Sequence, residues 1–187
     1  MPAQKSGPNL DALIARACRG DANAFGDLYE HYLTAIYRYV FYRVGDVAEA
    51  EDLTETVFLK AWEALDKYEV REVPFSAWLY RIAHNVVIDR HRTHKAAVSL
   101  ESVLPLPDET SGPEDQLDAL ENIETLAHAL SQLSADYQQV LTLRFISGLS
   151  HAETGRVLNR SEEAVRVLQY RALNALRQVL NRKPETR

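Results

Sequence analysis

Arginine and tyrosine side chains are spaced along the last apolar-periodic segment of the chain in a pattern that suits DNA. Arg166 and Tyr170 are four residues apart and share one face of a helix, and Arg171 flanks them. Arginine binds phosphate oxygens or guanine edges, and tyrosine can contact a phosphate or a thymine methyl group. Ser161 precedes two glutamates and is a candidate N-cap that would begin the same face. By spacing alone, an ordinary amphipathic helix with solvated arginines remains open.

A second set of polar and aromatic side chains lies on the segment FSAWLYRIAHNVVIDRHR. These residues fall on one helical face, opposite an apolar stripe: Trp78, Arg81, Asn85 and Arg92. Such a face can hold phosphates and stack on an unpaired base, which makes it a candidate single-strand site. Trp78 fits a plain core position equally well.

A third set is one leucine within an acidic strip on the segment AEDLTETVFLKAW. The strip has the spacing i, i+3, i+7 and i+11: Asp52, Glu55, Leu59 and Glu63. A partner-binding helix offers such a combination, with one apolar anchor and charges around it that steer the partner. A solvated acidic face with an incidental leucine is the alternative.

Metal chemistry and catalysis are poorly supported. His84, His91 and His94 lie close together, but no carboxylate or cysteine completes a convincing ligand set around them. The chain contains no Gly-rich phosphate loop, no G-x-S-x-G elbow and no H-E-x-x-H motif. We therefore expect no metal, no cofactor and no enzymatic activity.

These side chains require helices to position them, and the composition favours an all-α fold. The chain has 187 residues with only seven glycines and seven prolines, and apolar residues recur at helical spacing. The short helix, the turn at residues 159–161 and the final helix have the layout of a helix-turn-helix, whose second helix enters the major groove. The predicted helices span residues 11–19, 21–44, 47–65, 75–94, 117–130, 135–146, 149–158 and 162–180.

The charge pattern divides the chain into two small domains. Residues 97–116 are acidic and contain three prolines, which indicates a flexible linker. They separate an N-terminal domain, residues 1–96, from a C-terminal domain, residues 117–187. The net charge is −6, yet the end of the chain is rich in arginine, which indicates a local phosphate-binding surface on an acidic protein.

The sequence also indicates where in the cell the protein is expected. No run of about 18 apolar residues exists, so we expect no membrane insertion, and the first residues do not form a secretory signal. Cys18 is the only cysteine, which excludes an internal disulfide. We expect a cytoplasmic protein.

Taken in order, these segments resemble the extracytoplasmic-function sigma factors of bacterial RNA polymerase. The resemblance rests on DANAFGDLYEHY, AEDLTETVFLKAW, WLYRIAHNVVIDRHR, the Pro-rich linker and LSQLSADYQQVLTLRFISGLS, and it covers nearly the whole chain. It implies two helical domains, a factor that binds core RNA polymerase, and promoter DNA as the second partner. An anti-sigma factor is a further partner that the resemblance leaves open.

The resemblance also implies roles for the three sets. The strip containing Asp52, Glu55, Leu59 and Glu63 matches the family's docking surface for the largest polymerase subunit. The face containing Trp78, Arg81, Asn85 and Arg92, with the loop at residues 66–74, matches the part that captures the minus-10 element as a single strand. The helix containing Ser161, Arg166, Tyr170 and Arg171 matches the reader of the minus-35 duplex. The chain departs from the family at Glu55-Thr56 and at Thr154-Gly155, where glutamine with an acid and Ile-Ala are usual.

Two other functions would require different features of the chain. A stand-alone helix-turn-helix regulator has no use for the acidic docking strip or for a strand-capturing helix. A small metal-dependent hydrolase would bind a metal through the histidines, which metal analysis of the purified protein would detect. The ordered set of motifs favours a sigma factor that directs promoter-specific transcription initiation.

Overall fold

The computed structural model describes residues 9–68, 73–93, 123 and 125–181, and it is helical with no strand in those parts. The all-α prediction is therefore confirmed. The predicted linker at residues 97–116 lies outside the described residues, as do His94, residues 69–72 of the loop at 66–74 and the start of the helix expected at 117–130.

The N-terminal domain is built from four α-helices and a 3-10 turn. They are α1 (Leu10–Ala17), α2 (Ala22–Val44), α3 (Val47–Ala64), η1 (Leu65–Lys67) and α4 (Phe75–Thr93). Side chains accept hydrogen bonds from the first-turn amides of three of them: Asn9 for α1, Asp21 for α2 and Asp46 for α3. Gly45 ends α2 with a φ of 78°, a conformation that favours glycine. These caps explain why the sequence located the boundaries of these helices within two residues.

The C-terminal domain is a set of shorter helices. Residues 125–131 are helical, and α6 (Ala135–Leu141), η2 (Thr142–Ile146), α7 (His151–Leu158) and α8 (Glu162–Asn181) follow. The helix expected at 135–146 changes to a π turn at Thr142, and the Ser147 N–H donates to the carbonyl five residues back. The helix expected from residue 149 begins at His151 instead, because Ser150 and Glu153 form a capping box at its start.

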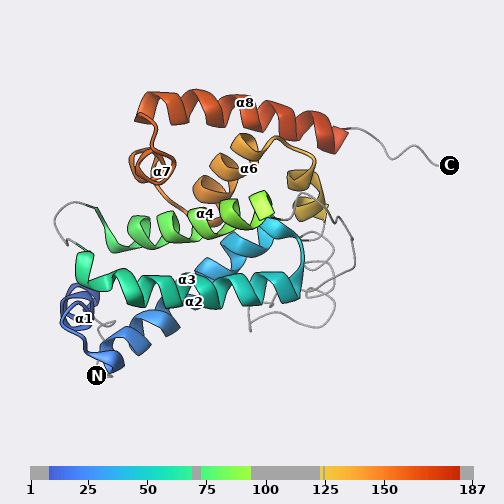
Figure 1. The fold of residues 1–187 in the computed structure, drawn as a ribbon. Helices are drawn as coiled ribbons and strands as arrows, with labels where there is room; N and C mark the ends of the chain where they lie inside the picture. The colour runs from blue at the N-terminus through green and yellow to red at the C-terminus, as the bar shows by residue number, and fades with distance from the viewer. Residues whose placement is uncertain (1–8, 69–72, 94–122, 124, 182–187) are drawn as a thin grey trace, which may run out of the picture.

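Both domains contribute to one hydrophobic cluster. Tyr39, Leu28 and Leu79 are fully buried in the N-terminal part, and Leu143 and Val165 are fully buried in the C-terminal part. In Figure 1, α8 lies on one side of the molecule, α7 and α6 lie between α8 and α4, and α2 and α3 lie beyond α4. The C-terminal domain thus rests on the N-terminal domain through α7 and η2.

Candidate functional site

An apolar groove lies on the surface of the N-terminal domain, where the start of α2 meets α3. Its volume is about 290 Å³, and its lining residues are Ala22, Phe25, Phe58, Leu59 and Trp62. The Leu59 side chain is 59% exposed and Trp62 is 38% exposed, although both are large and apolar. Phe25 supports Trp62, with ring centroids 4.9 Å apart and planes tilted by 57°. Large apolar side chains so exposed, next to a groove, are typical of a protein-binding surface.

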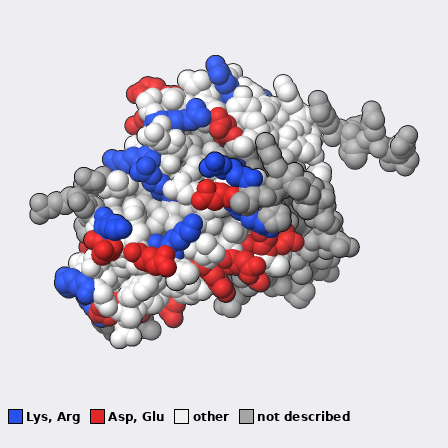
Figure 2. All heavy atoms as spheres, in the orientation of Figure 1, with Lys and Arg blue, Asp and Glu red and all other residues white. Residues whose placement is uncertain are grey.

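The acidic strip borders this groove. All four predicted residues are exposed on α3: Asp52, Glu55, Leu59 and Glu63. Figure 2 shows acidic side chains mostly on the part of this face formed by α3 and its neighbours, and basic side chains mostly toward α4 and α8. The structure thus places the predicted residues along one exposed side of α3, with Leu59 among them.

Phe25 and Trp62 also belong to this site, although they were not predicted from the sequence. Trp62 lies three residues after Leu59, so helical spacing could have placed it on the same face. Phe25 comes from another helix, and its place beside Trp62 depends on how α2 packs against α3.

The outer face of α4 carries the second predicted set. Arg81, Asn85 and Arg92 are all exposed, and they lie along one side of the helix. Trp78 is half-buried, with its ring centroid 5.0 Å from that of Tyr68 and 5.3 Å from that of Phe75. The tryptophan therefore packs on the aromatic core and leaves part of its surface beside the polar face. Trp78 thus has a packing role, and its role in stacking on a base stays a prediction.

A tight turn between α7 and α8 gives the helix-turn-helix its shape. Asn159 adopts the left-handed conformation with a φ of 53°, and the Arg160 N–H donates to the Gly155 carbonyl at 2.8 Å. A Cβ atom on Gly155 would lie 2.6 Å from the Arg160 carbonyl oxygen, which is closer than side-chain carbons approach backbone. The close approach of the turn to α7 therefore requires a glycine at this position.

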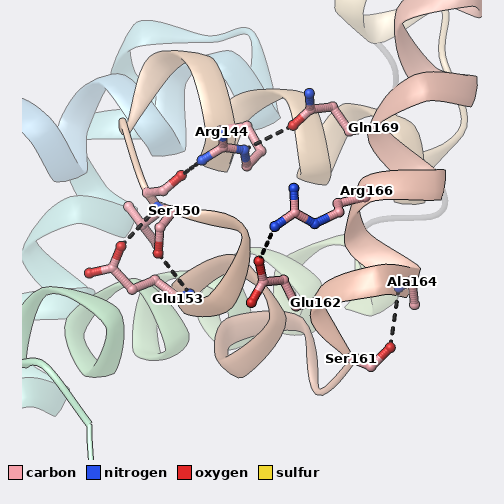
Figure 3. Close-up of polar contacts among 9 residues, drawn as sticks. Arg144, Ser150, Glu153, Ser161, Glu162, Ala164, Arg166 and Gln169 are labelled. Carbon is pink, nitrogen blue, oxygen red and sulfur yellow. Dashed lines mark hydrogen bonds and ion pairs between the residues drawn. The ribbon is translucent and has the colours of Figure 1, made fainter.

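Arg144 fixes α8 against the segment that precedes it. Its Nε donates to Gln169 Oε1 at 2.9 Å, and its Nη1 donates to the Leu149 carbonyl (Figure 3). The partner Gln169 lies on the half-buried side of α8, so the opposite side stays free for contacts.

The third predicted set lies on α8. Arg166, Tyr170 and Arg171 are exposed, and the Tyr170 side chain is 70% exposed. Arg166 forms an ion pair with Glu162 one turn earlier, and the Ser161 hydroxyl accepts a hydrogen bond from the Ala164 N–H (Figure 3). The predicted cap is therefore present. Arg166 is thus exposed while it pairs with a carboxylate of its own helix. A phosphate can replace that carboxylate as the partner of the guanidinium.

The described histidines do not form a metal site with neighbouring acids. Within the described residues, no group of three or more His, Cys, Asp or Glu side chains is arranged to hold a metal ion. Burial, with the nearby charge of Arg43 as the second cause, lowers the pKa of His84 to about 4.

Among the described helices, none has the length and apolar character needed to cross a membrane.

Comparison with known families and proteins matches both halves of the chain. Residues 28–97 match Sigma-70 region 2, and residues 129–178 match Sigma-70, region 4. The ECF RNA polymerase sigma factor BldN of Streptomyces coelicolor is 39% identical over 181 residues, covering 95% of this chain and 68% of BldN.

Two further similarities extend the comparison. The ECF RNA polymerase sigma factor SigW of Bacillus subtilis is 32% identical over 180 residues, covering 89% of this chain and 94% of SigW. The structure of CnrH in complex with the cytosolic domain of CnrY aligns with a TM-score of 0.72 at 26% identity, covering 91% of this chain and 96% of CnrH.

Proposed function

This chain belongs to the ECF RNA polymerase sigma factors and directs promoter-specific transcription initiation, and we propose that its two domains divide the work among three surfaces. The groove on α3 binds core RNA polymerase, the outer face of α4 binds the minus-10 element, and α8 binds the minus-35 element. The chain performs no reaction of its own, and the polymerase supplies the catalysis in the cytoplasm.

One observation carries the docking proposal. Leu59 and Trp62 are exposed beside a groove with aromatic lining, and the exposed carboxylates of Glu55 and Glu63 lie one turn to either side of Leu59. Large apolar side chains of this kind supply most of the binding energy at protein interfaces, and the surrounding charges increase the association rate. A helical segment of the largest polymerase subunit with basic side chains would match this surface.

The minus-10 proposal rests on the outer face of α4. Arg81 and Arg92 can contact phosphates along a strand, and Asn85 between them can donate to a base edge. The partly exposed ring of Trp78 offers a surface on which a base can stack. Stacking requires a base that is not paired in a duplex, so this face favours a single strand.

The minus-35 proposal rests on α8. Arg166, Tyr170 and Arg171 extend from the second helix of a helix-turn-helix, the element that enters the major groove. Glu162 would release Arg166 when a phosphate or a guanine edge approaches.

An anti-sigma factor is proposed as a further partner. The sigma factor RpoE of Bartonella quintana, whose structure aligns with this chain with a TM-score of 0.64, has been solved in complex with the anti-sigma factor NepR. An anti-sigma factor that covered the groove around Leu59 would prevent polymerase from docking there.

The test is run-off transcription with purified core RNA polymerase and a library of genomic templates. The wild-type chain should yield discrete transcripts from a restricted promoter set, and core polymerase alone should not. A stand-alone regulator would bind DNA but would add no new transcripts. That outcome would reject the proposed function.

A further inference from the structure

Few side chains of α8 are buried in the C-terminal domain. Among the described residues of this helix, only Val165 and Ala172 are buried, and its other apolar side chains are half-buried or exposed. Apolar contacts are non-directional, so they hold α8 against its neighbours without strongly fixing its rotation about its own axis. A directional contact, such as a hydrogen bond, is therefore needed to set that rotation.

Arg144 makes a directional contact of this kind. Its Nε donates to Gln169 Oε1 at 2.9 Å, and its Nη1 donates to the Leu149 carbonyl (Figure 3). One guanidinium thus joins η2 to the middle of α8 and to the residue that precedes the Ser150 cap of α7. Hydrogen bonds with Ser150 lower the pKa of Glu153 in the capping box, and the charges of nearby arginines, Arg144 among them, lower it further.

Arg144 also occupies an unusual backbone position. It is the central residue of the π turn η2, in which the Ser147 N–H donates to the Thr142 carbonyl. Single π turns of this kind are frequent at functional sites. The local geometry therefore supports a role for Arg144 beyond ordinary packing.

Gln169 lies close to the residues that are proposed to read DNA. It is half-buried, and it lies three residues after Arg166 and one residue before Tyr170, which are both exposed. Successive residues are about 100° apart around a helix, so Gln169 lies about 60° from Arg166 and about 100° from Tyr170. A bond that holds Gln169 therefore fixes the directions in which both exposed side chains extend.

Base recognition is more sensitive to that direction than phosphate binding is. A rotation of α8 by about 20° would move a side-chain tip about 6 Å from the helix axis by about 2 Å. Lengths of protein hydrogen bonds vary by only about 0.5 Å, so such a rotation breaks a contact to a base edge. The attraction between an arginine and a phosphate decreases gradually with distance and is largely retained.

We propose that Arg144 is a positioning residue for minus-35 recognition. By binding Gln169 and the Leu149 carbonyl, it sets the rotation of α8 and thereby the angle at which the exposed side chains meet the bases. This inference rests on the proposed function, in which α8 reads the minus-35 duplex. Loss of the contact lowers the discrimination between sequences more than it lowers the affinity for DNA in general.

The test uses holoenzyme, made from the full chain and core RNA polymerase, on a promoter recovered by run-off transcription. The minus-35 base pairs of this promoter are randomised, the minus-10 element is kept, and the bound templates are sequenced. Gln169→Leu keeps the approximate size of the side chain and removes the acceptor. It should lower the enrichment of preferred sequences by about fivefold or more, which is the lower limit for one good base contact. Arg144→Leu should lower the enrichment in the same way, and both variants should keep the wild-type slope of log K against log salt.

Two matched variants isolate the role of the hydrogen bond. Gln169→Glu retains an acceptor oxygen and should keep the wild-type sequence preference, although its added charge weakens binding to all sequences alike. Gln178→Leu, at an exposed glutamine of the same helix, should change neither the preference nor the salt slope. Thermal melting of each free protein shows that the variants being compared are folded.

Three results would overturn the proposal, and they differ in what else they reject. A wild-type preference in a well-folded Gln169→Leu protein would make the hydrogen bond structural only, even if the variant melts at a lower temperature. A salt slope lowered in magnitude by about one for Arg144→Leu, with Gln169→Leu unchanged, would make Arg144 a phosphate contact instead. If the wild type itself enriches no minus-35 sequence, the proposed role of α8 fails and the positioning role fails with it.

Discussion

The two domains present different kinds of surface. The N-terminal site is an apolar groove in which Leu59 and Trp62 stand exposed above an aromatic floor. The C-terminal site is a solvated helix face whose arginines are exposed, and Arg166 forms an ion pair with Glu162 of the same helix. The first surface gains free energy by burying apolar area, and the second gains it by replacing counterions on phosphates. Substitutions should therefore have different signatures in the two domains.

The largest expected effect is at the groove. Leu59→Arg should weaken the complex with core polymerase by about 2 kcal/mol or more, because it removes an apolar anchor and places a charge where the partner packs. Co-purification and titration with core polymerase measure the loss. Lys60→Ala, at an exposed neighbour on the same helix, is the control and should change binding by about 0.5 kcal/mol or less.

Thermal melting must accompany that measurement. Leu59 is 59% exposed, so its replacement should leave the melting temperature almost unchanged. Unchanged binding by a well-folded Leu59→Arg protein would remove the groove from the docking surface.

The turn of the helix-turn-helix offers a test confined to the C-terminal domain. Gly155→Ala places a methyl group 2.6 Å from the Arg160 carbonyl oxygen, so the turn must shift. We expect a loss of about 1–3 kcal/mol in the free energy of unfolding, typical of overpacking. Chemical denaturation measures it, with Gly26→Ala as the control because a Cβ there meets nothing within 4 Å. An equal free energy of unfolding for Gly155→Ala and the wild type would show that the turn relaxes without cost.

The two DNA-binding surfaces can be tested separately, because each is expected to act at a different step of transcription initiation. Arg81→Ala or Asn85→Ala should keep minus-35 binding but lose the open complex, and a pre-melted template should rescue a defect confined to opening. Arg166→Ala should fail at closed-complex binding even on a pre-opened template, with a loss of about 1–3 kcal/mol if it reads a base edge. Permanganate footprinting detects the open complex. Failure of both groups at the same step would contradict the two-site division.

Arg171 distinguishes a phosphate contact from a base contact on α8. If it binds a phosphate, Arg171→Ala should weaken binding of all sequences alike and lower the magnitude of the slope of log K against log salt by about one. Titration of duplex DNA at several salt concentrations provides the slope. A loss confined to one base position would instead assign Arg171 to direct readout.

Much of this architecture was predictable from local signals. Ser161 caps its helix as expected, and Asp21 and Asp46 also accept hydrogen bonds from first-turn amides at the starts of α2 and α3. The exposed positions on α3, α4 and α8 follow from helical spacing, because each helix has one apolar side to bury.

The rest depends on packing between distant segments. Phe25 reaches Trp62 only because α2 packs across α3, and Arg43 meets Gln138 only because the two domains touch. The π turn at η2 has no simple sequence marker, although the Thr142 hydroxyl donates to the Gln138 carbonyl at 2.8 Å where the helix widens. A sequence read by periodicity cannot supply contacts of this kind.

The smallest expected effect is a loss of stability at acidic pH, and it tests the boundary between the two domains. Burial and the charge of Arg43 hold the pKa of His84 at about 4, while Asp136 of α6 acts in the opposite direction; an unfolded histidine titrates near 6.5. Between pH 4 and pH 6.5 the unfolded chain therefore binds more protons than the folded chain, so stability increases with pH across this window and falls on acidification. Because His84 is half-buried and solvent screens part of the effect, we expect about 1 kcal/mol or less. His84→Gln should flatten the dependence of the melting temperature on pH between 4 and 6.5, whereas His31→Gln, at an exposed position, should leave it unchanged. If His84→Gln follows the wild-type pH profile, the imidazole is not held neutral, and the boundary around Arg43 is more hydrated than its burial indicates.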